Sequence, residues 1–169
     1  MKLNLLNRKI HYWLSLFVAL PLLVIVSTGI MLQWKKKVSW IQPAEHTAGP
    51  GEPQLSLVQM VEIARTVPEA GIRSWSDIAR VDIRPGRNLV KLVSHTRWEI
   101  QLDARNGAIL QTAYRRSDLI EEIHDGSFFH DRAKLWVFFP AALGLLVLAL
   151  TGIWLFLQPF VRRRGTGAS

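Results

Sequence analysis

Residues 10–33 read IHYWLSLFVALPLLVIVSTGIMLQ and contain no lysine, arginine, aspartate or glutamate. As an α-helix this run would be about 36 Å long, enough to cross the hydrocarbon core of a bilayer with some tilt. Pro21 is tolerated inside a membrane helix as a kink. A cleaved signal peptide is the alternative, but the run is too long for one and no small-x-small cleavage site precedes the lysines at 35–37. The sequence therefore predicts a first transmembrane helix.

A second apolar run covers residues 135–158, LWVFFPAALGLLVLALTGIWLFLQ, and stops before a proline. Trp34, Trp136 and Trp154 lie near the predicted membrane interfaces, as expected of an aromatic belt. We therefore expect two transmembrane helices in contact with membrane lipid.

The two runs resemble each other. ALPLLVIVSTGIML (19–32) aligns with ALGLLVLALTGIWL (142–155), which places Thr28-Gly29 over Thr151-Gly152. Any two apolar helices share leucine and valine, whereas a shared Thr-Gly-Ile is less common. The helices run in opposite directions, so Thr28-Gly29 would lie near the outer face and Thr151-Gly152 near the inner face. Small residues let another helix or a flat cofactor approach closely.

Charge and composition favour a membrane anchor. The chain has 169 residues, a net charge of +8 and no cysteine, which excludes disulfides, thiolate zinc sites and iron–sulfur clusters. All thirteen acidic residues lie within 45–131, whereas both ends are purely basic. Basic ends beside apolar runs indicate membrane anchoring rather than nucleic-acid binding. The lysines at 35–37 carry little weight for orientation, because they belong to a long loop. The basic tails therefore place both termini in the cytoplasm and residues 34–134 outside, as an expectation from sequence.

The outer segment is predicted to hold a small α+β domain. A Pro- and Gly-rich linker precedes SLVQMVEIARTV, in which Leu57, Met60, Val61 and Ala64 recur at helical spacing and Ser56 is a candidate N-cap. RVDIRP, NLVKLVSH and WEIQLD alternate in polarity, and a DARNG turn precedes AILQTAYR, which predicts an antiparallel meander. No catalytic constellation stands out there, and His46 and His95 lack convergent partners.

The predicted organisation is therefore a membrane protein with two transmembrane helices and an extracytoplasmic α+β domain. Its parts are a basic tail (1–9), the first transmembrane helix (10–33), a linker (34–54), the α+β domain (55–116), a juxtamembrane segment with a short amphipathic helix (117–134), the second transmembrane helix (135–158) and a second basic tail (159–169).

Three histidines lie at the predicted membrane interfaces. His11 is at the inner edge of the first helix, and His124 and His130 precede the second in EEIHDGSFFHDRAKLWVFF (121–139). They are either incidental interfacial residues or ligands. Ionisable residues at this depth indicate function by default, and imidazole is a favoured ligand of haem iron.

One chain cannot ligate a haem with His11 and His124, because a span separates them. A two-fold homodimer would supply a four-helix bundle and a second copy of each ligand, giving one haem near each face. We expect Asp125 or Asp131 to orient the imidazoles. The candidate partners of the haem propionates are Arg8, Lys9 and Arg162 inside and Arg132 and Lys134 outside.

Taken together, these segments resemble the PepSY-associated transmembrane family. The residues that carry the resemblance are RKIHYWLSL (8–16), Thr28-Gly29, IHDGSFF (123–129) and Thr151-Gly152, and the helix-plus-meander resembles the PepSY domain. Larger relatives with about four spans include haem-containing reductases of ferric siderophores in the bacterial inner membrane.

The resemblance implies haem b, with His11 and His124 as first choices for axial ligands and His130 as the alternative to His124. It also implies electron transfer across the inner membrane to a ferric siderophore or another periplasmic acceptor. This chain has two spans instead of four, so a homodimer is expected, although a separate multi-span partner is a further alternative. The competing hypothesis is a non-enzymatic, membrane-anchored PepSY module with a regulatory or scaffolding role.

Overall fold

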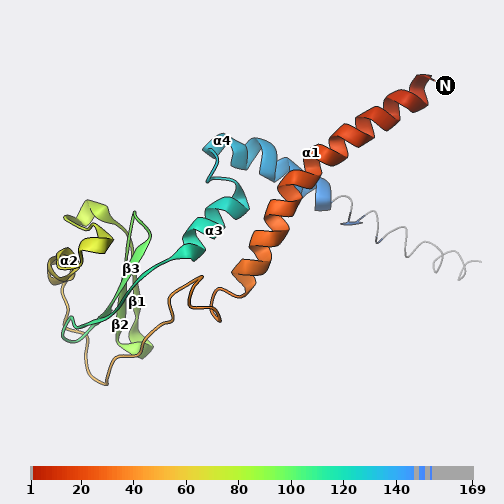
Figure 1. Cartoon of the computed structure of the whole chain (residues 1–169). Helices are drawn as coiled ribbons and strands as arrows, with labels where there is room; N and C mark the ends of the chain where they lie inside the picture. The colour runs from red at the N-terminus through yellow and green to blue at the C-terminus, as the bar shows by residue number, and fades with distance from the viewer. Residues whose placement is uncertain (1, 147–148, 151–152, 154–169) are drawn as a thin grey trace, which may run out of the picture. The chain divides into compact units, whose positions relative to one another are not determined.

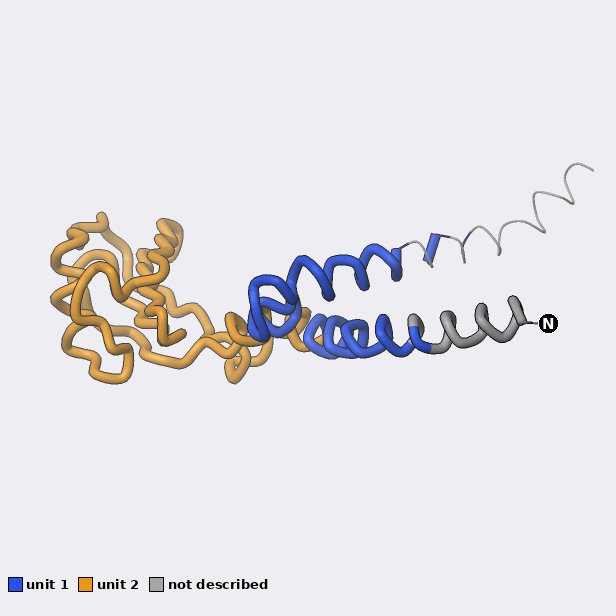
Figure 2. The backbone as a smooth tube through the Cα atoms, turned by 90° about the horizontal axis from the view of Figure 1, so that it is seen from above, with its two compact units in different colours: residues 1–29, 122–169 blue, residues 30–121 orange. Residues whose placement is uncertain are grey.

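The computed structural model describes residues 2–146, 149–150 and 153, with side chains at 13 and from 16 onward. The chain divides into two compact units, residues 1–29 with 122–169 and residues 30–121 (Figure 2). The first unit contains nearly all of the long N-terminal helix, and the second contains the β-sheet (Figure 1).

Helix α1 (Lys2–Gln33) is continuous through Pro21. Its part Leu16–Gln33 is long and apolar enough to cross a membrane, and it is the one such helix among the described residues. Leu20 and Leu23 are 61% and 65% exposed, as expected of side chains that contact lipid or another helix rather than a soluble core.

The predicted second transmembrane helix is described only in part. A π-helix, η4 (Lys134–Phe138), leads into helical residues at 139–146, 149–150 and 153. The remaining positions of 135–158 lie outside the described residues, so this transmembrane helix stays a prediction.

The juxtamembrane segment contains α3 (Arg116–Asp125), which includes the short helix expected at 117–123, and α4 (Asp131–Ala133). Gly126 directly follows α3, and its φ of +83° is the left-handed conformation common just after a helix. A β-carbon at Gly126 would lie 2.4 Å from Phe138 Cδ2, so the turn is closely packed against η4. The turn and η4 thus fix each other's position.

The second unit contains the expected helix and meander. Helix α2 (Leu57–Arg65) begins at the N-cap Ser56, which forms a capping box with Gln59. Three short 3₁₀ turns, η1 (Pro68–Ala70), η2 (Trp75–Asp77) and η3 (Pro85–Arg87), lie among the connections. The four strands form an antiparallel sheet in the order β1 (Ile78–Arg84), β2 (Leu89–Ser94), β3 (Trp98–Asp103) and β4 (Ile109–Tyr114).

One face of this sheet packs against α2. Met60 and Ala64 belong to a buried cluster with alternate residues of the two central strands, namely Val90, Leu92, Ile100 and Leu102. Met60 and Ala64, two of the four residues expected on one face of this helix, therefore lie in the core, as their helical spacing predicts. Leu57, which was expected on the same helix face, is 53% exposed.

Candidate functional site

His124, in the last turn of α3, lies against α1. Its Nδ1 is 2.9 Å from the Thr28 hydroxyl oxygen, although 96 residues separate them in sequence. Thr28 is buried and His124 is partly buried. The Thr28 hydroxyl also contacts the Val24 carbonyl oxygen one helical turn earlier, at 2.5 Å. His124 is therefore held by a side chain of the membrane-crossing helix.

Gly29, next to Thr28, leaves space for the imidazole ring of His124. A β-carbon at Gly29 would lie 3.5 Å from His124 Cε1, which is an ordinary van der Waals distance. Alanine would therefore fit there, whereas a larger side chain would displace the imidazole. The Thr28-Gly29 pair thus provides both a polar contact and the space that the ring occupies.

His130 has a different role. It is the N-cap of α4, and its Nδ1 accepts a hydrogen bond of 3.0 Å from the Arg132 amide. The imidazole thereby satisfies one of the amides that a helix start leaves without an intrahelical partner. The geometry separates the two outer histidines, because His124 packs on α1 and His130 caps a helix.

Asp125, one of the two carboxylates expected to orient an imidazole, has its own partners in the juxtamembrane segment. Asp125 accepts hydrogen bonds from Lys134 and from the Ser127 hydroxyl and amide, rather than from an imidazole. Burial opposes ionisation of Asp125, but these hydrogen bonds outweigh it and lower the pKa of the carboxyl group. Lys134 is therefore engaged by Asp125, while Arg132 and Asp131 are exposed.

Several predicted site residues fall outside what the structure describes. Thr151 and Gly152 lie outside the described residues, and His11 and Arg8 belong to α1 with only their backbone described. Among the described side chains, no group of three or more histidines and carboxylates is arranged to hold a metal ion.

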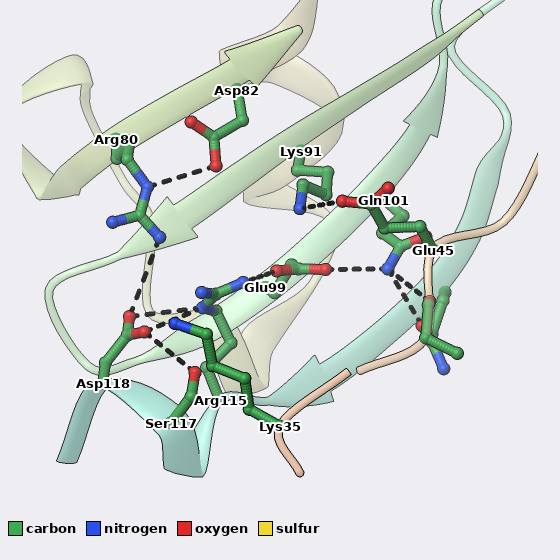
Figure 3. A network of polar contacts seen from close by, with 12 residues as sticks. Lys35, Glu45, Arg80, Asp82, Lys91, Glu99, Gln101, Arg115, Ser117 and Asp118 are labelled. Atoms are coloured by element: carbon green, nitrogen blue, oxygen red, sulfur yellow. Dashed lines mark hydrogen bonds and ion pairs between the residues drawn. The ribbon is translucent and has the colours of Figure 1, made fainter. Parts of the chain in front are cut away.

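A second polar cluster lies on the sheet face opposite α2 (Figure 3). Lys91, Glu99, Gln101 and Arg115 are all buried there. Arg115 contacts Glu99 and also Asp118, at 3.1 Å, and the Gln101 amide donates to Glu99 at 2.7 Å. No buried polar side-chain atom among the described residues lacks a hydrogen-bond partner. The cluster is satisfied internally, as expected of a structural network.

The predicted linker covers this face. It has no helix or strand at residues 43–56, yet it is bound to the sheet rather than free. Lys91 Nζ lies 2.8 Å from the Glu45 carboxylate, and Gln101 donates to the Ala44 carbonyl oxygen at 2.8 Å. Asn88 donates to two carbonyl oxygens farther along the linker, those of Gly49 and Gly51, each at 2.9 Å.

A family model described as the PepSY-associated TM region matches residues 8–168. The chain belongs to the PepSY-associated transmembrane family. Neither a comparison with curated proteins nor one with solved structures gave a match. The match covers nearly the whole chain, so α1, the sheet domain and the segment around His124 all belong to this PepSY-associated region. Family membership and the apolar helix together indicate association with a membrane.

Sequence reasoning missed the buried network of this PepSY module. The alternation in NLVKLVSH and WEIQLD separated the two sheet faces correctly, but alternation alone does not indicate what covers the polar face. All six residues of β2 are buried. The available signal was Lys91 opposite Gln101 in the register of β2 and β3, which places polar groups side by side.

Proposed function

We propose that this PepSY-associated membrane protein binds haem b through His124 and carries electrons across the bilayer. The observation that carries this proposal is the position of His124 on Thr28 and Gly29 of the membrane-crossing helix. Imidazoles placed at this depth are unusual unless they serve a ligand or a proton path. Among the described residues, no hydrogen bond to Nε2 of His124 accompanies the one at Nδ1.

The chemistry of the available donors fits haem. A porphyrin supplies four nitrogen ligands, so the protein needs to supply only the axial ones. Because His130 caps α4, each chain offers one imidazole at the outer level, and we infer that a second copy supplies the other. His11 is the candidate at the inner level. Arg132 is exposed and suited to a propionate.

The acceptor that we propose is a ferric siderophore or another periplasmic oxidant, with the protein in the bacterial inner membrane, residues 34–134 outside and both termini in the cytoplasm. The absence of cysteine excludes an iron–sulfur relay within the chain. Haem bound by histidine is therefore the redox group that this composition allows most directly.

An optical spectrum of the purified full-length protein tests the proposal. The wild type should show a Soret band that shifts on reduction, and the solubilised oligomer should be a dimer containing two haems. The His124→Ala variant should lose half of the haem, whereas His95→Ala, at an exposed histidine of the sheet domain, should lose none. Wild-type protein without haem bands, after expression with sufficient haem, would refute the proposal.

The second candidate is a non-enzymatic regulatory or scaffolding module. An apolar groove of about 400 Å³ between α2 and η2 favours it, with Leu57, Val58 and Trp75 exposed along its wall. Exposed apolar grooves are common protein-binding surfaces. Under this alternative, the membrane fraction would lack haem bands, and Trp75→Ala would reduce capture of a partner without changing the fold.

A further inference from the structure

The Thr28 hydroxyl has one hydrogen to donate, and its oxygen contacts both carbonyl oxygens of its own helix and Nδ1 of His124. Its oxygen is 2.5 Å from the Val24 carbonyl oxygen and 3.3 Å from that of Ile25. Carbonyl oxygens only accept hydrogen bonds. In the hydrogen bond between the Thr28 hydroxyl and the Val24 carbonyl oxygen, the hydroxyl is therefore the donor.

Because the Thr28 hydroxyl donates its hydrogen within its own helix, the imidazole of His124 must be the donor in its contact with Thr28. The Thr28 oxygen has only lone pairs left for His124, whose Nδ1 is 2.9 Å away. Nδ1 must therefore carry a hydrogen and donate it. In a neutral imidazole with Nδ1 protonated, Nε2 has the free lone pair that a metal requires.

We propose that Thr28 is a positioning residue that fixes His124 as the Nδ1–H tautomer and so leaves the lone pair of Nε2 available to a haem iron. The tautomer follows from the contacts above, and the iron-binding role of Nε2 rests on the proposed function. A hydrogen bond donated by the unligated nitrogen orients the ring and increases the basicity of the ligating nitrogen, as the hydrogen-bond partners of ligating histidines do in other metal sites. The low dielectric near the membrane strengthens this hydrogen bond.

The tautomer is measurable without haem. Long-range proton–nitrogen NMR correlations on the full-length, ¹⁵N-histidine-labelled apoprotein in detergent distinguish a protonated Nδ1 from a protonated Nε2 at alkaline pH. The signals that disappear in His124→Ala assign the residue. Thr28→Val removes the acceptor at similar volume, and Thr28→Ser retains it. Ser27→Ala is the matched control, because the Ser27 hydroxyl donates to the carbonyl oxygen of Leu23, four residues earlier, as Thr28 does to Val24. Among the described residues, Ser27 has no hydrogen bond to a histidine.

We expect a protonated Nδ1 in the wild type, in Thr28→Ser and in Ser27→Ala. Thr28→Val should shift His124 toward the Nε2–H tautomer, which free histidine prefers. A protonated Nε2 in the wild type would overturn the proposal. So would a Thr28→Val spectrum identical to that of the wild type.

The midpoint potential of the haem-loaded protein provides a second readout. Loss of the hydrogen bond makes the ligating nitrogen less basic and ferric iron less stable, so Thr28→Val should shift one of the two potentials to a more positive value. Thr28→Ser should show no shift, and an unshifted potential in Thr28→Val would refute the positioning role. If the wild type has the Nδ1–H tautomer but binds no haem, the proposed function and the role of Nε2 fail, while the tautomer assignment stands.

Discussion

The ammonium group of Lys91, whose side chain is 2% exposed, lies 2.8 Å from the carboxylate of Glu45. Lys91 belongs to the centre of the sheet and Glu45 to the segment that follows α1. Glu45 also contacts Arg84 at 3.4 Å and Arg87 at 3.7 Å, so its carboxylate compensates three cations. This residue therefore attaches the predicted linker to the sheet domain, and several tests depend on it.

Glu45→Ala should destabilise the domain more than Lys91→Met. Loss of Glu45 leaves the buried ammonium group of Lys91 without a counterion, which should lower the free energy of unfolding by about 3 kcal/mol. This is the low end of the range for a buried pair, because the Glu45 side chain is 26% exposed. Lys91→Met removes the buried charge, while Glu45 keeps two arginines, so its cost should be roughly 1 kcal/mol or less. Urea unfolding of the full-length protein, followed by tryptophan fluorescence, measures both.

Limited proteolysis should show where the effect of Glu45→Ala arises. Cleavage within residues 44–51 should accelerate in Glu45→Ala, because this segment would detach from the sheet. The exposed Glu52 provides a control, and Glu52→Ala should be cleaved at the wild-type rate. Equal cleavage rates in the two variants would exclude attachment through Glu45.

The stability of the sheet domain should decrease in acid. The hydrogen bond from Lys91 lowers the pKa of Glu45 below its ordinary 4.5, and that from Arg105 lowers the pKa of Asp103 below 3.8. A carboxyl group whose pKa is lower in the folded than in the unfolded protein stabilises the fold, and this stabilisation is complete at pH values above the unfolded-state pKa. This contribution disappears as the pH falls through the folded value. Thermal unfolding midpoints should thus be constant down to about pH 4.5 and then fall, with a shallower decrease in Glu45→Ala.

Gly126→Ala should disrupt the turn between α3 and η4. Its left-handed backbone costs a non-glycine residue about 1–2 kcal/mol, and the added methyl group would collide with Phe138. We expect a lower unfolding temperature and loss of haem from the loaded protein, because His124 lies two residues earlier. Gly144→Ala is the control, since a β-carbon there meets nothing within 4 Å. A Gly126→Ala protein as stable as this control would contradict the packing described.

His130→Ala should affect the helix start and not the cofactor. Loss of the hydrogen bond from the Arg132 amide to the capping side chain should lower the free energy of unfolding by about 1 kcal/mol. His130→Asn should restore this stability, because asparagine is a good N-cap. Haem content should stay at the wild-type level in both variants. If His130→Ala loses haem as His124→Ala does, His130 is the outer ligand and the assignment is reversed.

The sequence predicted those parts of the fold that depend on local pattern. An uncharged apolar run sufficed for residues 10–33 of α1, which begins earlier, at Lys2, within the predicted basic tail. Helical spacing and period-two alternation sufficed for α2 and the four strands. Ser56 was correctly identified as a cap, because capping depends on neighbours within one turn. The sequence also selected His124, Thr28 and Gly29 as candidates.

The tertiary structure decided how these residues meet. Only the fold placed His124 on Thr28, 96 residues earlier, and gave His130 to a helix cap. It also showed that the polar side chains of β2 and β3 are buried beneath the segment containing Glu45. Alternation distinguishes two faces of a strand but contains no information about what covers each face. Pairing between distant segments depends on how the whole chain packs, and local periodicity does not encode it.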